Sequence, residues 1–176
     1  MAALQYLIDT LLSLAELAFL LRLLLQWARA DFRNPLLRSL VEITNPVLVP
    51  VRRVLPSVGR IDTASIVVVL VLGFARSAAH ARLDGSWLFF SPLSLLVRTV
   101  FDLVRMSLWT CFVSVFGYAL LSTLSQGSWS PPLGALGALA EPILRPIRKL
   151  IPPLANLDLS PLWACILIQA LLLLLP

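Results

Sequence analysis

Charged residues are scarce in this 176-residue chain: Asp, Glu, Lys and Arg make up 13% of it, against roughly 25% in an average soluble domain. Hydrophobic residues make up 59%, and the mean hydropathy is +0.92. A water-soluble protein of this composition lacks the polar residues needed to cover its surface, and a disordered chain is far less apolar. The composition therefore predicts an integral membrane protein.

Residues that commonly bind metals, haem or nucleotides are also scarce. The chain has one histidine, His80, and two cysteines, Cys111 and Cys165, each inside an apolar run. It has no CxxC pair, no paired metal ligands and no glycine-rich phosphate loop. These absences exclude a disulfide scaffold, and we expect no catalytic residue, cofactor or metal site. We interpret His80 as an interfacial polar residue and the cysteines as small apolar packing groups.

Basic residues outnumber acidic ones, and the net charge is +5. They are scattered over an apolar chain, without interleaved aromatic residues on which nucleic-acid bases could stack. We therefore expect anionic lipid as a partner, no direct contact with nucleic acid, and no small-molecule substrate.

Four apolar stretches are long enough, or nearly so, to cross a hydrocarbon core of about 30 Å. They are residues 4–27, 63–79, 106–124 and 159–175. The first and third loops between them carry nine Lys and Arg residues, and the opposite side carries four. The positive-inside rule then predicts that these two loops are cytoplasmic and that both termini lie outside.

The prolines indicate an internal repeat. Pro35, Pro46, Pro50 and Pro56 are spaced by 11, 4 and 6 residues, and Pro131, Pro142, Pro146 and Pro152 repeat the spacing 96 residues later. Identical residues at the same offset include Leu48/Leu144, Arg52/Arg148 and Asp62/Asp158. We expect an all-α membrane protein with four transmembrane helices in two tandem, parallel repeats. The expected ranges are 1–80 and 106–176, with a connecting segment, 81–105, whose amphipathic helix begins at Ser91-Pro92.

Each repeat is predicted to contain a short, kinked amphipathic helix between its two spans. The first such helix, from Pro46 to Pro56, would have Asn45 as its cap and a kink at Pro50. The predicted structural motif, including an aspartate that caps each following span, is Pro46, Pro50, Pro56, Asp62, Pro142, Pro146, Pro152 and Asp158. The basic face, which we expect to bind lipid or a partner, is Arg52, Arg53, Arg145, Arg148 and Lys149. Two interpretations are open: anchoring at an anionic interface, or basic grooves that dock a partner.

The two motif copies resemble a known family. The first reads Arg22-Leu-Leu-Leu-Gln26-Trp27, Thr44-Asn45-Pro46, Pro50-Val-Arg52-Arg53 and Asp62, and the second reads Glu141-Pro142, Pro146-Ile-Arg148-Lys149 and Asp158. The pattern resembles the YggT family of bacterial membrane proteins over nearly the whole chain, in the tandem form of proteobacterial members. The second copy lacks the Asn and Thr that precede Pro46 in the first.

The resemblance implies a multi-pass protein of the bacterial inner membrane, without a known enzymatic activity. Chloroplast members are assembly factors for haem attachment in the cytochrome b6-f complex, and cyanobacterial and plastid relatives are linked to nucleoid or thylakoid organisation. Bacterial members are linked to resistance to osmotic shock, with potassium uptake as a proposed role. The single histidine of this chain excludes a bis-histidine haem site within it.

Polar residues inside the spans are the remaining candidates, because they are costly there and usually face a bundle interior or a cavity. One stripe of the first span carries Gln5, Asp9, Ser13 and Glu16. We expect Asp9 to pair with Arg105, its equivalent at offset 96, and Arg76 to end near the same level. Glu16 has no evident cation near the midplane, and Gln169 is a candidate hydrogen-bond partner. Glu16 is then either a neutral group that holds helices together or a site that a cation or proton occupies on its path through the membrane.

The sequence leaves two classes of function open. The leading hypothesis is a non-enzymatic membrane protein that organises other membrane components, or assists their assembly, through its basic cytoplasmic helices. Another membrane protein or a second copy of the chain would be its partner. The alternative is a small transporter or channel subunit in potassium or osmotic homeostasis, which the polar stripe with Glu16 favours.

Overall fold

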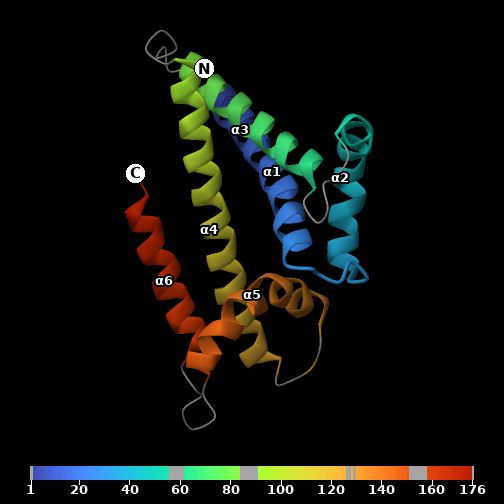
Figure 1. Cartoon of the computed structure of the whole chain (residues 1–176), viewed down its shortest axis with the longest axis vertical. Coiled ribbons are helices and arrows are strands. Elements are labelled where there is room, and N and C mark those ends of the chain that lie inside the picture. Colours follow the sequence, from blue (N-terminus) through green and yellow to red (C-terminus); the bar gives the residue numbers. More distant parts are fainter. Residues whose placement is uncertain are drawn as a thin grey trace. The chain divides into compact units, whose positions relative to one another are not determined.

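The structure, a computed structural model, describes residues 2–55, 62–83, 91–125, 128, 130–150 and 158–175. These residues form helices and their connections, and none of them lies in a strand, so the predicted all-α class is confirmed. The helices are α1 (Ala2–Trp27), α2 (Pro35–Val54), α3 (Thr63–Leu83), α4 (Pro92–Leu124), α5 (Pro131–Leu150) and α6 (Ser160–Leu174) (Figure 1).

Two helices of the described residues are long and apolar enough to cross a membrane. They are Thr63–Arg82 in α3 and Pro92–Leu124 in α4, and only 39% and 17% of their apolar windows are buried. A core helix of a soluble protein would be mostly buried, so these exposed apolar surfaces support membrane association. The apolar helix α6 is shorter, with 15 residues, and α1 carries Asp9, Glu16 and Arg22 within its length.

Helix α4 begins where the sequence predicts. The hydroxyl of Ser91 accepts a hydrogen bond from the backbone N–H of Ser94 at 3.2 Å, and Pro92 takes the first helical position. A serine cap followed by proline is a favourable helix start, because the proline N lacks the hydrogen that would otherwise be unsatisfied. The 33 residues of α4 make it roughly 50 Å long at 1.5 Å per residue.

The chain forms two compact units by its contacts. The first contains Met1–Leu23 and Thr44–Met106, and the second contains Leu24–Ile43 and Ser107–Pro176. The ranges expected for the two repeats, 1–80 and 106–176, stay a prediction.

In the first unit, α1 and α3 run side by side (Figure 1). Contacts between Asp9 and His80 and between Glu16 and Arg76 show that the two helices are antiparallel. The buried apolar side chains of this unit include Phe19, Leu20, Leu48, Val68, Val69 and Leu95. This packing aligns the polar stripe of α1 with charged residues of α3.

In the second unit, α5 packs against α6. The core consists of Val115 from α4, Ala140 and Leu144 from α5, and Ala164 and Ile168 from α6. The small side chains of the alanines let the helices approach closely, as is common between membrane helices.

The proline-containing helices are longer than predicted. Helices α2 and α5 have 20 residues each and begin at Pro35 and Pro131, with the other prolines inside them. The predicted start at Pro46 with Asn45 as cap is wrong, because Asn34 provides the earlier cap: its Oδ1 accepts the N–H of Leu36 at 3.0 Å.

The internal prolines interrupt the hydrogen bonding of these helices without ending them, and α5 visibly changes direction along its length (Figure 1). The internal positions are Pro46 and Pro50 in α2 and Pro142 and Pro146 in α5. Pro56 and Pro152, which were predicted to end the helices, lie outside the described residues.

Candidate functional site: an ionic cluster and two helix clamps

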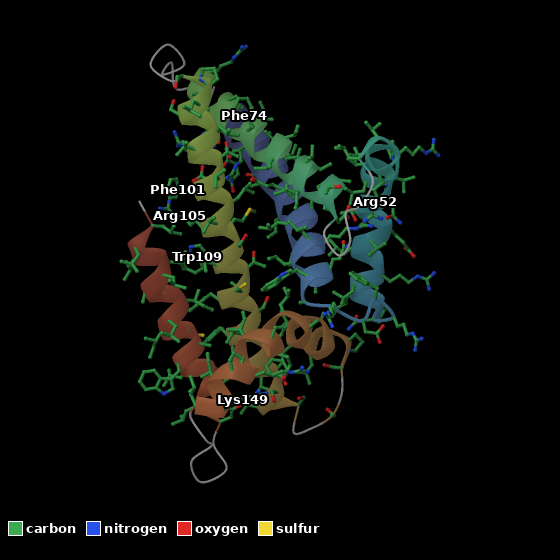
Figure 2. All side chains as sticks on the ribbon, viewed as in Figure 1. Arg52, Phe74, Phe101, Arg105, Trp109 and Lys149 are labelled. Carbon is green, nitrogen blue, oxygen red and sulfur yellow. The ribbon has the colours of Figure 1, made fainter. Side chains whose placement is uncertain are left out.

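The first clamp, formed by Arg52, Asp62 and Ser65, ties the end of α2 to the start of α3. The guanidinium of Arg52 donates to both carboxylate oxygens of Asp62, from Nε at 3.3 Å and from Nη2 in a shorter contact. The Ser65 hydroxyl donates to the same carboxylate at 2.6 Å. Figure 2 shows Arg52 at the end of α2 beside the start of α3. A bidentate arginine–carboxylate pair holds a defined orientation, so this contact fixes where α2 ends.

Asp62 is the most enclosed member of the first clamp, since only 1% of its side chain is exposed. Burial by itself raises the pKa of Asp62, but the hydrogen bonds from Arg52 and Ser65 outweigh burial and hold the pKa below its ordinary value. The carboxylate therefore stays ionised, and Asp62 lies directly before α3, as predicted for its cap.

The second clamp, formed by Arg148, Asp158 and Glu141, repeats this arrangement 96 residues later. Arg148 donates from Nε to Asp158 at 2.8 Å and from Nη1 to Glu141 at 3.0 Å. The hydroxyl of Tyr118 also donates to Glu141, at 3.1 Å. Burial raises the pKa of Glu141, but these donors outweigh it and the pKa lies below its ordinary value. The same Arg–Asp pair thus joins α5 to the start of α6.

Asp158 differs from its predicted role as the helix cap. The cap position of α6 is Leu159, which has no side-chain hydrogen bond to offer. The carboxylate of Asp158 instead accepts the backbone N–H of Ser160 at 3.0 Å, from one position farther out. A backbone N–H at the start of α6 is therefore still bonded to a carboxylate, because the side chain of an aspartate can accept the N–H two residues later in a local turn.

The clamps divide the predicted basic face. Arg52 and Arg148 form ion pairs with carboxylates in their own units, while 37% and 34% of their side chains remain exposed. That they bind lipid or a partner stays a prediction. The exposed basic residues are Arg53, Arg145 and Lys149, of which Arg145 also lies 3.5 Å from Glu141. Figure 2 shows Lys149 near the end of α5.

A second group of charges, the ionic cluster, consists of Asp9, Glu16, Arg76 and His80 on α1 and α3. The Glu16 carboxylate lies 3.1 Å from Arg76 Nε, and Asp9 Oδ1 lies 2.6 Å from His80 Nε2. The prediction that Glu16 has no cation nearby is wrong, because the antiparallel packing of α3 brings Arg76 to it. His80 contacts Asp9, a pairing that the sequence did not predict, and its place at the membrane interface stays a prediction.

The sequence predicts two further partners for the cluster, Gln169 and Arg105. Gln169 belongs to α6, in the other compact unit from Glu16, so their pairing stays a prediction. Arg105 is an exposed residue of α4, and its pairing with Asp9 likewise stays a prediction. Sequence reasoning missed the contact of Asp9 with His80. The signal was present, because Asp9 and Glu16 are two turns apart on α1, and Arg76 and His80 are one turn apart on α3.

A small cavity lies against three members of the ionic cluster. Its lining includes Asp9, Arg76 and His80, and its volume of about 10 Å³ is room for about one water molecule. Gly73 completes the enclosure of Glu16: a Cβ atom at this glycine would lie 2.7 Å from Glu16 Oε1 and 2.9 Å from Thr99 Cγ2. Nothing in the sequence singled out Gly73, since a glycine inside a helical pattern has no distinctive signal.

Comparison with known proteins matches residues 1–83 and 97–176 to the CCB3/YggT family. The chain belongs to the YggT family. The resemblance read from the motifs is thereby confirmed.

Relatives within the YggT family cover most of the chain. The uncharacterised protein YggT of Escherichia coli strain K12 is 35% identical over 175 residues, which covers 97% of this chain and 88% of the relative. An uncharacterised protein of Pseudomonas aeruginosa is 36% identical over 159 residues (90% and 81%), and one of Vibrio alginolyticus is 38% identical over 168 residues (91% and 86%). No solved structure matches the chain.

In the part of the chain that the structure describes, no group of three or more His, Cys, Asp and Glu side chains is placed to hold a metal ion.

Proposed function

We propose that this member of the YggT family is a non-enzymatic, multi-pass protein of the bacterial inner membrane that organises other membrane components or assists their assembly. In this proposal four spans form two tandem units, the proline-rich helices lie at the cytoplasmic surface, and both termini lie outside. Anionic lipid and another membrane protein, or a second copy of the chain, are its partners. It contacts no nucleic acid directly and has no small-molecule substrate.

The observation that carries this proposal is the pair of equivalent clamps. Each holds the last turn of a proline-containing helix against the start of the next helix, through Arg52–Asp62 in one unit and Arg148–Asp158 in the other. A helix held at its end presents its remaining side chains in a constant orientation, which a binding surface needs. Scaffolding at a surface is the use that best fits such fixed helices.

The side chains beside each clamp have the composition of an interfacial helix. The apolar residues Val54 and Leu150, which are equivalent at offset 96, are 79% and 82% exposed. Exposed basic residues adjoin them, namely Arg53 in α2 and Lys149 in α5. Apolar side chains beside basic ones suit the boundary between acyl chains and anionic headgroups.

The test removes the exposed charges and keeps the clamps. The triple variant Arg53→Gln, Arg145→Gln, Lys149→Gln, reconstituted in nanodiscs, should lose preference for phosphatidylglycerol over phosphatidylcholine, measured by quenching of tryptophan fluorescence with brominated lipid. Each base contributes about 1 kcal/mol near an anionic surface. Because Glu141 partly neutralises Arg145, we expect a loss of roughly tenfold rather than the full sum.

The matched control loses the same charge elsewhere. The control residues are exposed and lie at the end of α2 that is away from the clamp: Arg29 and Arg33 precede α2, and Arg38 is in its first turn. Changing these three to glutamine should leave the lipid preference within about twofold, because the headgroup contact depends on the helix ends. An equal loss in both triple variants would mean that net charge alone acts, and the proposal for the helix ends would fail.

A second candidate is favoured by the contact between Glu16 and Arg76, which is buried inside the first unit. It is a small transporter or channel subunit in potassium or osmotic homeostasis, since charges inside spans often mark ion pathways. Proteoliposomes that contain only this protein should then show potassium flux that Glu16→Gln abolishes. The absence of flux with the wild-type protein would remove this candidate.

A further inference from the structure

At two pairs of equivalent positions, the first unit carries charged residues and the second unit carries apolar ones. At offset 96 from Glu16 and Arg76 stand Phe112 and Leu172, and both pack against the apolar core of the second unit. Apolar side chains at these two positions are thus compatible with a packed helical unit of this family. The charges in the first unit are not needed for packing as such, and a buried charge pair is seldom a better way to stabilise a core than apolar residues.

Exposure falls in order along the ionic cluster. The side chains of Asp9 and His80 are 38% and 35% exposed, Arg76 is 19% exposed, and Glu16 is 1% exposed. Glu16 lies seven residues beyond Asp9 on α1, about 10 Å along the helix. We call the exposed Asp9–His80 end of the cluster its open end and the buried Glu16 end its closed end. The cavity, with room for about one water, lies at the open end against Asp9, His80 and Arg76, and Glu16 is not part of its lining.

The carboxylate of Glu16, at the closed end, lacks hydrogen bonds. Its contact with Arg76 lacks hydrogen-bond geometry, and neither of its carboxylate oxygens has a hydrogen-bond partner among the described residues. Two further acids act on it electrostatically, Asp9 on its own helix and Asp102 on α4. Asp102 in turn lies 3.9 Å from Arg98. Among the described residues, Arg76 is the one cation within 4 Å of Glu16, and a proton on Glu16 would relieve the repulsion from Asp9 and Asp102.

We infer that Glu16 is a proton-binding site, reached from the Asp9–His80 end of the ionic cluster. The proton enters from bulk solvent at His80, whose imidazole binds one proton and releases one toward the buried end of the cluster. The proton ends on a carboxylate oxygen of Glu16, where an O–H bond forms and one negative charge is neutralised. Arg76 stays protonated throughout, and its charge remains balanced because Asp9 faces the same cavity.

This inference does not rest on the lipid-binding proposal, and it requires no potassium flux. It assigns His80 as the residue that relays the proton and Glu16 as the group that binds it. Gly73 provides the room that the Glu16 carboxyl occupies, because a Cβ atom at this position would lie 2.7 Å from Glu16 Oε1.

Infrared difference spectroscopy of the full chain in nanodiscs, between pH 8 and pH 5, tests the binding step. A buried carboxyl C=O band should appear on acidification in the wild-type protein and be absent from Glu16→Gln. In the control variant Glu42→Gln, which removes a carboxylate that is 62% exposed, the buried band should remain. A buried band that persists in Glu16→Gln, or that responds to potassium chloride and not to pH, overturns the inference.

Time-resolved spectra after a pH jump test the route. His80→Gln keeps a hydrogen-bond donor for Asp9 but does not titrate, so the Glu16 band should reach the same amplitude at least tenfold more slowly. A merely structural role for His80 would change the melting temperature or the amplitude instead of the rate. An unchanged rate with normal amplitude would contradict the route through His80.

Discussion

Replacing Arg52 by methionine is expected to lower the free energy of unfolding by about 3 kcal/mol, the size of effect seen when one partner of a buried ion pair is removed. Asp62 is only 1% exposed, and Arg52 donates to both of its oxygens. Methionine keeps much of the apolar stem of the arginine, so the loss reports the stranded carboxylate more than lost packing. Reversible unfolding in detergent would measure it.

The equivalent change in the second clamp is the matched control. In the wild-type protein 41% of the Asp158 side chain and 29% of the Glu141 side chain are exposed. Water can therefore solvate both acids when Arg148→Met removes their partner. We expect a loss of about 1 kcal/mol, in the range of partly exposed ion pairs. Equal losses in the two variants would contradict the view that burial of Asp62 makes the first clamp the stronger one.

Acid should erase the difference between wild type and Arg52→Met. The clamp holds the pKa of Asp62 below its ordinary value of 3.8, so its contribution to stability is full above that value. The contribution is lost as the pH falls through the lower pKa of the folded protein, because the unfolded state then binds the proton first. In Arg52→Met the arginine no longer offsets the burial that raises the pKa of Asp62, so the stranded carboxylate binds a proton at a higher pH than in the wild-type protein. The stability gap should therefore be largest near pH 8, begin to shrink as the pH falls through the pKa of the variant, and shrink further below about pH 4.

Replacing Gly73 by alanine is expected to destabilise the first unit by about 2 kcal/mol, a typical cost of overpacking. The new Cβ would lie 2.7 Å from Glu16 Oε1 and 2.9 Å from Thr99 Cγ2. Glu16 is held beside Arg76, and the branched side chain of Thr99 has few alternative rotamers. Neither neighbour can move away cheaply, so the helices must separate.

Gly117→Ala provides the comparison. Its Cβ would lie 3.0 Å from Leu136 Cδ1, the end of a flexible side chain that can rotate. Alanine is favoured over glycine inside a helix by up to about 1 kcal/mol, so this variant should be neutral or stabilised. Adding Thr99→Ser to Gly73→Ala removes the clashing methyl and should recover part of the melting temperature. No recovery would place the strain at Glu16 alone.

Several properties of the chain follow from the sequence alone, because they depend on composition and on neighbours along the chain. The apolar excess predicts membrane association. Proline after a capping residue predicts the start of α4 at Pro92, and the repeated prolines predict two similar helices, although Asn34 rather than Asn45 begins the first. Capping and proline geometry act over three or four residues, so they can be read locally.

The tertiary structure alone decided which charges meet. Asp9 contacts His80, Glu16 contacts Arg76, and Arg52 contacts Asp62. These pairs depend on the register of antiparallel helices and on the path of the chain between them. A shift of one residue turns a helical side chain by about 100°, given 3.6 residues per turn, and would face it toward a different neighbour. Residues 71 positions apart, such as Asp9 and His80, meet only because the packing of the apolar faces of α1 and α3 sets that register.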